Sequence, residues 1–234
     1  MDQTPSTPSP SPNWIDLAIT LGGIVLIFVT LSLGTAWLSQ RWPHEQILLY
    51  LNGFATQLCF ALLIIIMKIA RKHSWADLGW RRVPIVPLWG PILGLYVLVW
   101  ILNILYVSYL YARGLTPPSN DVYTQLFSNT TWLTFLLNVL LAGITAPLVE
   151  ETLFRGIVFG GLQKYFGQWT AAVISAILFS GLHLQAYGFI PRFVLGLALA
   201  TLYRRYRSLR PSVILHAINN LILVTLAFLP RPGA

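Results

Sequence analysis

Long apolar stretches separated by short polar connections dominate the chain. Each stretch is continuously apolar rather than alternating between apolar and polar residues, which is typical of helices. A helix needs about 20 mostly apolar residues to cross the hydrocarbon core of a membrane. The pattern therefore predicts an all-α, polytopic bundle of about seven to eight transmembrane helices. The expected spans are 14–39, 46–70, 85–112, 131–146, 168–184, 189–206 and 212–229, with a further helix at 148–165.

Proline and the N-terminal composition set the expected boundaries. Pro147 is expected to break or kink the path between the span that ends at 146 and the helix that follows. Residues 1–13 are rich in Pro, Ser and Thr and predict a disordered tail. No basic region precedes the first apolar stretch, so we expect a retained helix and not a removed signal peptide. Residues 14–230 are expected to form a single transmembrane domain.

Composition and charge agree with a lipid environment. Only 9% of the 234 residues are charged and 56% are hydrophobic, whereas a soluble domain carries about 25% charged residues. The net charge of +8 lies in short connections, so it indicates membrane orientation and not a nucleic-acid partner. The loops 68–82 and 204–210 are strongly basic, which predicts that both are cytoplasmic and that the N-terminus is cytoplasmic too.

Ionisable residues that lie inside the apolar stretches are the candidates for catalytic chemistry. A charged residue at the centre of a membrane helix costs at least ~2.5–3.5 kcal/mol, so it marks a functional site by default. Among the acidic residues, only Glu150 and Glu151 lie inside a long apolar neighbourhood. His183 and His216 lie in or at the end of apolar spans. The candidate chemistry is thus concentrated in the C-terminal half.

The two glutamates are expected to differ. Glu151 and Arg155 are four residues apart, in the favourable order for an ion pair on one helix face. Glu150 points about 100° away around the helix and has no cation nearby in the sequence. An unpaired, desolvated carboxylate suits a general base. The alternative is that both glutamates only complement the helix dipole after Pro147.

Two further polar pairs follow. Phe179 and His183 are one turn apart, and His216 and Asn220 share one helix face. Taken alone, His183 fits an interfacial residue, and the His216–Asn220 pair fits a hydrogen bond between membrane helices. Taken together with Glu150, these residues can activate a water through Glu150 and His183 and stabilise a tetrahedral oxyanion through His216 and Asn220.

Three short motifs carry a family resemblance: VEETLFRG at 149–156 is similar to EExxxR, FSGLH at 179–183 to FxxxH, and HAINN at 216–220 to HxxxN. Over roughly residues 131–225, the chain resembles the CAAX-protease and bacteriocin-processing family, also called CPBP or ABI, which includes the type II CAAX prenyl endopeptidases.

The resemblance implies a helical bundle with a cavity open toward the cytoplasmic side. It implies that Glu150 and His183 activate the water and that His216 and Asn220 form the oxyanion hole. Glu151, Arg155 and Phe179 are then supporting residues.

The metal question is open at this stage. Two histidines and a carboxylate can hold zinc with an open fourth position, for which Glu150, His183 and His216 are the candidates. A metal-free mechanism is equally compatible, because a glutamate–histidine pair can itself act as the base. Neither the motifs nor their spacing decide between the two.

The leading hypothesis is an intramembrane endopeptidase that cleaves a peptide or protein substrate at the membrane, with a prenylated CAAX sequence and a leader peptide both open as substrates. The alternative is a non-catalytic membrane scaffold or immunity-type protein of the same fold. A proton-coupled transporter is disfavoured, because transporters often show repeated halves and this sequence shows no repeat.

Overall fold

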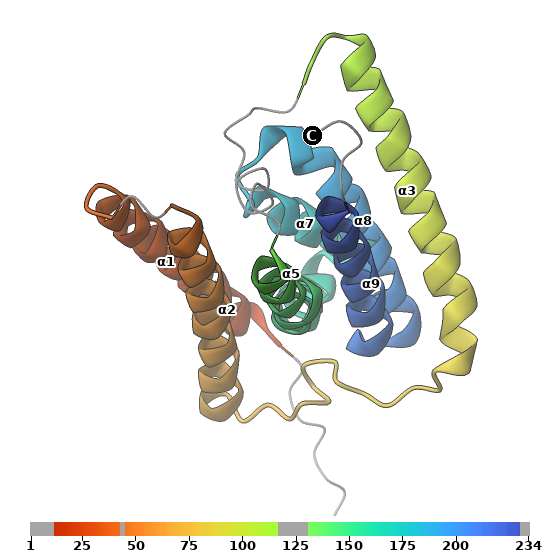
Figure 1. Cartoon of the computed structure of the whole chain (residues 1–234). Coiled ribbons are helices and arrows are strands. Elements are labelled where there is room, and N and C mark those ends of the chain that lie inside the picture. Colours follow the sequence, from red (N-terminus) through yellow and green to blue (C-terminus); the bar gives the residue numbers. More distant parts are fainter. Residues whose placement is uncertain (1–11, 43–44, 117–130, 230–234) are drawn as a thin grey trace, which may run out of the picture.

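The computed structural model describes residues 12–42, 45–116 and 131–229, and their regular structure is helical (Figure 1). Apart from Pro12 and Asn13, the predicted N-terminal tail lies outside the described residues. The first elements are α1 (Trp14–Ser39), α2 (Glu45–Ala70), the 3₁₀ turn η1 (Val86–Leu88) and α3 (Trp89–Ala112). The C-terminal elements are α5 (Trp132–Asn138), the π-helical η2 (Val139–Thr145), α6 (Ala146–Glu151), the π-helical η3 (Thr152–Phe159), α7 (Gly160–Gly181), α8 (Ala186–Tyr206) and α9 (Leu209–Phe228).

The predicted fold class, an all-α transmembrane bundle, is confirmed. In the described part of the chain, six helical stretches are long and apolar enough to cross a membrane, slightly fewer than the predicted seven to eight. The difference arises because Trp132–Gly181 is counted as one stretch, although the chain reverses within it. The predicted break at Pro147 is wrong: Pro147 lies in the first turn of α6, directly after the π-helical turns of η2. The altered hydrogen-bond pattern there accommodates a residue that has no N–H.

The chain instead turns back at Gly167, between the predicted helices 148–165 and 168–184. Gly167 has φ 75° and ψ 169°, a conformation that glycine adopts without the steric penalty of a Cβ. Residues on the two sides of this turn pack together: the Ser175 hydroxyl donates to the Phe154 carbonyl at 2.9 Å, and the rings of Phe154 and Phe179 are 5.4 Å apart. The turn therefore folds α7 back onto the helix that carries the glutamates.

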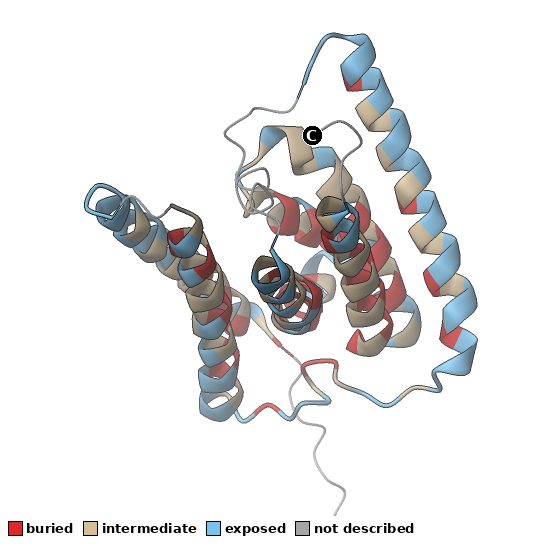
Figure 2. Cartoon of the chain, in the orientation of Figure 1, coloured by how far each residue is buried: buried red, intermediate tan, exposed pale blue. Residues whose placement is uncertain are grey.

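Buried polar contacts anchor the first turns of α1, and near its end Thr35 accepts from Asn52 on α2 at 2.7 Å. The Asn13 side chain accepts from the N–H groups of Ile15 and Asp16 and so caps the helix. Asp16 is fully buried and pairs with Arg71 at 2.7 Å. Further along α1 most residues are exposed (Figure 2). In a membrane protein such an apolar exposed face is solvated by lipid.

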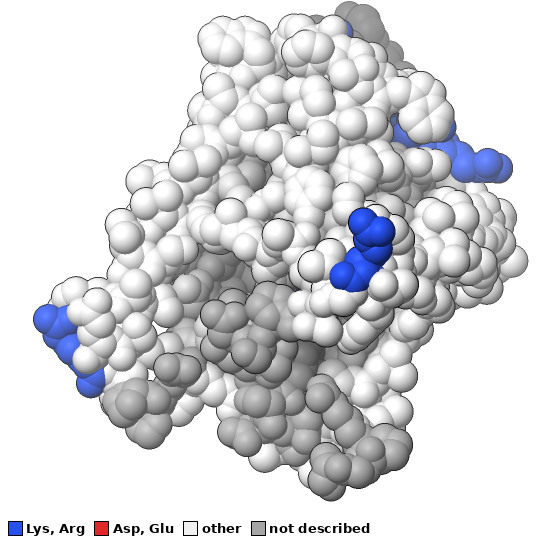
Figure 3. Space-filling model, turned by 90° about the horizontal axis from the view of Figure 1, so that it is seen from above, with Lys and Arg blue, Asp and Glu red and all other residues white. Residues whose placement is uncertain are grey.

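The two basic loops meet at one end of the bundle. The Leu209 N–H donates to the Gly79 carbonyl at 2.8 Å, and the Ser208 hydroxyl donates to the Arg81 carbonyl at 2.7 Å. The Asp16–Arg71 pair brings the start of α1 to the same end. The opposite end shows only isolated basic side chains on its visible described surface (Figure 3). This arrangement agrees with one cytoplasmic side for both loops and the N-terminus, and the orientation itself stays a prediction.

The bundle core joins the N-terminal helices to the C-terminal ones. One buried cluster contains residues from α1, α2, η3 and α7, including Phe60, Leu153 and Phe179. A second joins α3, α8 and α9. The loop 68–82 also contacts η3, because the Trp80 indole donates to the Thr152 hydroxyl at 3.0 Å. The helix that carries the glutamates is therefore held on several sides.

Candidate active site

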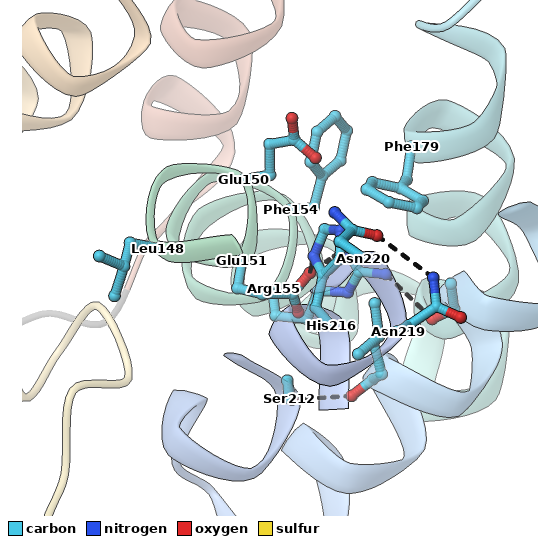
Figure 4. A network of polar contacts seen from close by, with 12 residues as sticks. Leu148, Glu150, Glu151, Phe154, Arg155, Phe179, Ser212, His216, Asn219 and Asn220 are labelled. Carbon is cyan, nitrogen blue, oxygen red and sulfur yellow. Dashed lines mark hydrogen bonds and ion pairs between the residues drawn. The ribbon is translucent and has the colours of Figure 1, made fainter. Parts of the chain in front are cut away.

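Both glutamates stand on α6, a six-residue α-helical piece between the π-helical segments η2 and η3. π-Helical turns are rare and occur frequently at functional sites. The two carboxylates leave the helix on different sides: Figure 4 shows Glu150 pointing away from the side chains of Glu151 and Arg155. The divergence follows from the 3.6-residue repeat, so neighbouring glutamates reach different surroundings.

Glu151 lies at the centre of a buried network. Its Oε1 accepts from the Arg155 guanidinium at 3.0 Å and from Nδ1 of His216 at 3.1 Å. The side chains of Glu151 and Arg155 are 0% exposed and that of His216 is 3% exposed. The predicted Glu151–Arg155 ion pair is confirmed, and the sequence analysis missed that His216 joins it.

Arg155 and Phe179 connect this network to the FxxxH motif. Arg155 also donates to the Gly196 carbonyl at 3.1 Å, and its guanidinium lies 4.6 Å from the centre of the Phe179 ring. The Phe179 ring is 5.4 Å from the ring of His183 and 5.6 Å from that of His216, edge to face in both cases. Phe179 therefore sets the separation of the two histidines.

The sequence suggested that Glu150 is unpaired, but the structure gives it a hydrogen-bond partner. The Gln57 amide on α2 donates to its Oε1 at 2.8 Å. Gln57 belongs to none of the three motifs, and its one signal in the sequence is a polar side chain inside the apolar span 46–70. Among the described residues, the donor in contact with Glu150 is thus neutral, while Arg155 and His216 act on the carboxylate electrostatically from further away.

His183 lies in the connection between α7 and α8, where its Nδ1 is 2.9 Å from the Phe179 carbonyl. Because a carbonyl can only accept, Nδ1 donates and Nε2 of the neutral ring is left as an acceptor. Burial, aided by the positive charge of Arg192, lowers the pKa of His183 to about 4. The ring is therefore neutral at pH 7 and can accept a hydrogen bond from water.

The HxxxN pair is tied down at both ends. The Asn220 amide donates to the Ala142 carbonyl in η2 at 2.8 Å, and its oxygen accepts from Asn219 at 3.2 Å. That bond to Ala142 uses one of the two amide N–H groups. Nδ1 of His216 faces Glu151, so His216 can donate through Nε2 only when the imidazole carries both protons.

The charged groups of the three motifs act on one another. Glu150 interacts electrostatically with Glu151, Arg155 and His216, and His183 interacts with His216. The structure thus gathers residues of all three motifs around Phe179 and α6.

The donor set does not fit a zinc ion. Within residues 12–42, 45–116 and 131–229, no three His, Cys, Asp or Glu side chains are grouped so that they can hold a metal together. Glu150, His183 and His216, the candidates from the sequence, are included in that comparison. Nδ1 of His216 is engaged by Glu151, and Nδ1 of His183 by a backbone carbonyl, so Nε2 is the ring nitrogen of each that is left for another partner. We derive no catalytic step through a metal.

An open, largely apolar cavity of about 430 Å³ lies at the connection between α7 and α8. Gly181 and Leu184, on either side of His183 in the sequence, contribute to its wall together with the first turns of α8.

Comparison with known proteins tests the family resemblance. The family model "Type II CAAX prenyl endopeptidase Rce1-like" matches residues 132–222. That region is similar to the Rce1-like family. The Rce1-like region contains all seven site residues expected from the sequence, and Gln57 lies outside it. The resemblance to the CPBP family is thereby confirmed.

Relatives extend the similarity toward the N-terminus. The chain is 28% identical over 192 residues to an Escherichia coli protein named "Uncharacterized 24.3 kDa protein", covering 78% of this chain and 86% of the relative. It is 21% identical over 192 residues to the Bacillus subtilis protein named "Putative membrane peptidase YdiL", covering 80% and 77%. No solved structure shows a significant match. The Rce1-like family and the Bacillus relative together indicate a membrane protease.

Proposed function

We propose that this Rce1-like protein is an intramembrane endopeptidase in which Glu150 acts as the general base toward a water molecule. The observation that supports this most is the contrast between the two glutamates. Glu151 is neutralised by Arg155 and His216, whereas Glu150 has only the neutral Gln57 amide. A carboxylate without a contacting cation retains the basicity that proton abstraction needs.

The proposed reaction is hydrolysis of a peptide bond. The water gives one proton to the free oxygen of Glu150 and donates its other hydrogen to Nε2 of His183, while its oxygen attacks the carbonyl carbon. The developing oxyanion is stabilised by His216 and by the Asn220 amide. When the intermediate collapses, the C–N bond breaks and Glu150 returns its proton to the leaving nitrogen, which gives a carboxylic acid, whose hydroxyl comes from the water, and an amine.

Glu151, Arg155 and Phe179 act as supporting residues in this proposal. The Glu151 carboxylate accepts from Nδ1 of His216 and so holds the ring with Nε2 outward. Arg155 fixes Glu151 in turn and stacks on Phe179. The substrate in this proposal is a peptide or protein at the membrane, and a prenylated CAAX sequence and a leader peptide are both compatible.

The test compares peptide termini in membranes from cells that produce the wild type or Glu150→Gln at equal levels. The proposal expects uncut precursors to accumulate with Glu150→Gln and not with Asp77→Asn, a matched carboxyl-to-amide change in the loop 68–82. Identical termini in all three samples would remove the protease assignment. A biological effect that survives Glu150→Gln would favour the non-catalytic scaffold.

A further inference from the structure

Gln57 is a buried polar residue that no motif of the Rce1-like region includes. It stands on α2, is 7% exposed, and donates from Nε2 to Oε1 of Glu150 at 2.8 Å. We propose that Gln57 is a positioning residue of the protease, which fixes the Glu150 carboxylate with its amide N–H and receives a backbone N–H of the bound peptide with its carbonyl oxygen. This inference rests on the proposed function.

The hydrogen bond makes the two oxygens of Glu150 different. Oε1 is taken by Gln57, so the other oxygen, Oε2, is the one available to the water. Gln57 itself is held by a packed stretch of α2, since Phe60 and Ile64, three and seven residues further on, are buried in the same core cluster as Leu153. A partner on a rigid helix keeps a general base in its productive rotamer.

The other side of the Gln57 amide is unsatisfied. Its Oε1 is buried and has no hydrogen-bond partner among the described residues. The amide cannot simply be turned over, because its oxygen would then face the carboxylate of Glu150, and two acceptors repel each other. A buried acceptor without a donor is unfavourable and rare in folded proteins. A peptide substrate carries backbone N–H groups that match this acceptor beside the water-activating carboxylate.

The charged groups around Glu150 are few, so the effect of Gln57 is measurable. Glu151 and Arg155 on the same helical stretch and His216 on α9 interact electrostatically with Glu150. None of them is changed when Gln57 is replaced. Loss of the Gln57 donor removes a hydrogen bond to the ionised form of Glu150, which is a strong class of hydrogen bond. The midpoint of Glu150 protonation is then expected to rise by about one to two pH units.

The first experiment needs no substrate. Infrared spectra of the purified wild type in lipid nanodiscs are recorded across a pH titration, and the protonated Glu150 band is assigned by its loss in Glu150→Gln. We expect Gln57→Met, which has similar volume but no amide, to raise the titration midpoint by about one to two pH units. Thr56→Val, one residue away on α2 and bonded only to Asn52, serves as the control and is expected to leave it unchanged. An unchanged midpoint in Gln57→Met would overturn the inference.

Gln57→Glu covers the case in which Gln57→Met does not fold. It keeps size and polarity but places a second carboxyl beside Glu150, so one of the two retains a proton to higher pH. The pair should titrate in two steps, the higher of which lies above the wild-type Glu150 midpoint, and a single midpoint equal to the wild type would overturn the inference.

The second experiment uses a peptide whose cleavage depends on Glu150. With Gln57→Met, we expect the acid limb of the kcat–pH profile to move to higher pH. At pH values below the wild-type midpoint, kcat should therefore fall about 10- to 100-fold relative to the wild type. KM should also rise. With Gln57→Glu, which retains an acceptor, KM should rise less. If both Gln57 variants keep the wild-type kcat, KM and pH profile while Glu150→Gln is inactive, this inference is overturned and the proposed function stays intact. A wild type that cleaves nothing would instead remove the proposed function.

Discussion

Replacement of Arg155 by methionine gives the sharpest test of how the buried network is held together. Arg155 is completely buried and makes three contacts: one with Glu151 at 3.0 Å, one with the Gly196 carbonyl at 3.1 Å, and one with the Phe179 ring. Methionine fills similar volume and removes the charge. Glu151 is then left as a buried carboxylate whose only remaining partner is His216.

The magnitude follows from that loss. Breaking one partner out of a buried ion pair costs about 3–5 kcal/mol. His216 can still donate to Glu151, and a hydrogen bond to a charged group contributes ~1.5–3 kcal/mol, so we expect the lower end, about 3 kcal/mol. Arg155→Lys keeps the charge but cannot bond Glu151 and Gly196 as a planar fork, and we expect about 1–2 kcal/mol. The double variant Glu151→Leu/Arg155→Met removes both charges and should recover part of the loss.

The assay is SDS-driven unfolding in mixed micelles, followed by tryptophan fluorescence, since the chain contains nine tryptophans. We expect the wild type to have the highest free energy of unfolding, followed by Arg155→Lys and the double variant, with Arg155→Met the lowest. A value for Arg155→Met within about 1 kcal/mol of the wild type would refute the reasoning, because that is the range of an exposed ion pair. A double variant less stable than Arg155→Met would refute it too.

Two further predictions concern packing and pH. Gly156→Ala should destabilise the protein by about 1–3 kcal/mol, because the added Cβ would collide with the Leu78 backbone carbonyl. Gly94→Ala adds a Cβ where nothing lies within 4 Å, so it should be neutral or stabilising in the same unfolding assay. Equal effects of the two changes would contradict the packing account. Burial lowers the pKa of His183 in the folded protein to about 4 from 6.5. As pH drops from about 6.5 toward 4, His183 therefore binds a proton in the unfolded chain but not in the folded one, so the free energy of unfolding should fall over this range. His183→Gln should flatten that part of the pH–stability curve, and a curve with the wild-type slope would contradict the assignment.

Much of the fold follows from local sequence signals. The spans of α1 and α3 and the Glu151–Arg155 pair depend on apolar length and on the i, i+4 spacing, so the sequence was sufficient to predict them. The break at Pro147 was predicted wrongly because proline usually interrupts helices. The π-helical turns before it are a backbone arrangement that sequence periodicity does not show.

The partners of the candidate residues could not be predicted in the same way. Gln57 and Glu150 are 93 residues apart, and His216 and Glu151 are 65 apart. Such contacts depend on how α2 and α9 pack against α6, and motif spacing carries no information about helix packing. The residue types of the site were readable from their unfavourable positions in apolar spans, whereas the pairing among them required the structure.

The central proposal is that Glu150 and His183 act on the same water, and a double-mutant comparison of cleavage tests it most directly. On a peptide identified by its dependence on Glu150, single-turnover rates are measured for Glu150→Gln, His183→Gln and the double variant. Residues that act as a unit are not additive, so each single change should lower the rate by about 10²- to 10⁴-fold and the double variant should be no slower than the worse single one. A His183→Gln rate within tenfold of the wild type, or a double variant that shows the product of both losses, would contradict the shared-water mechanism.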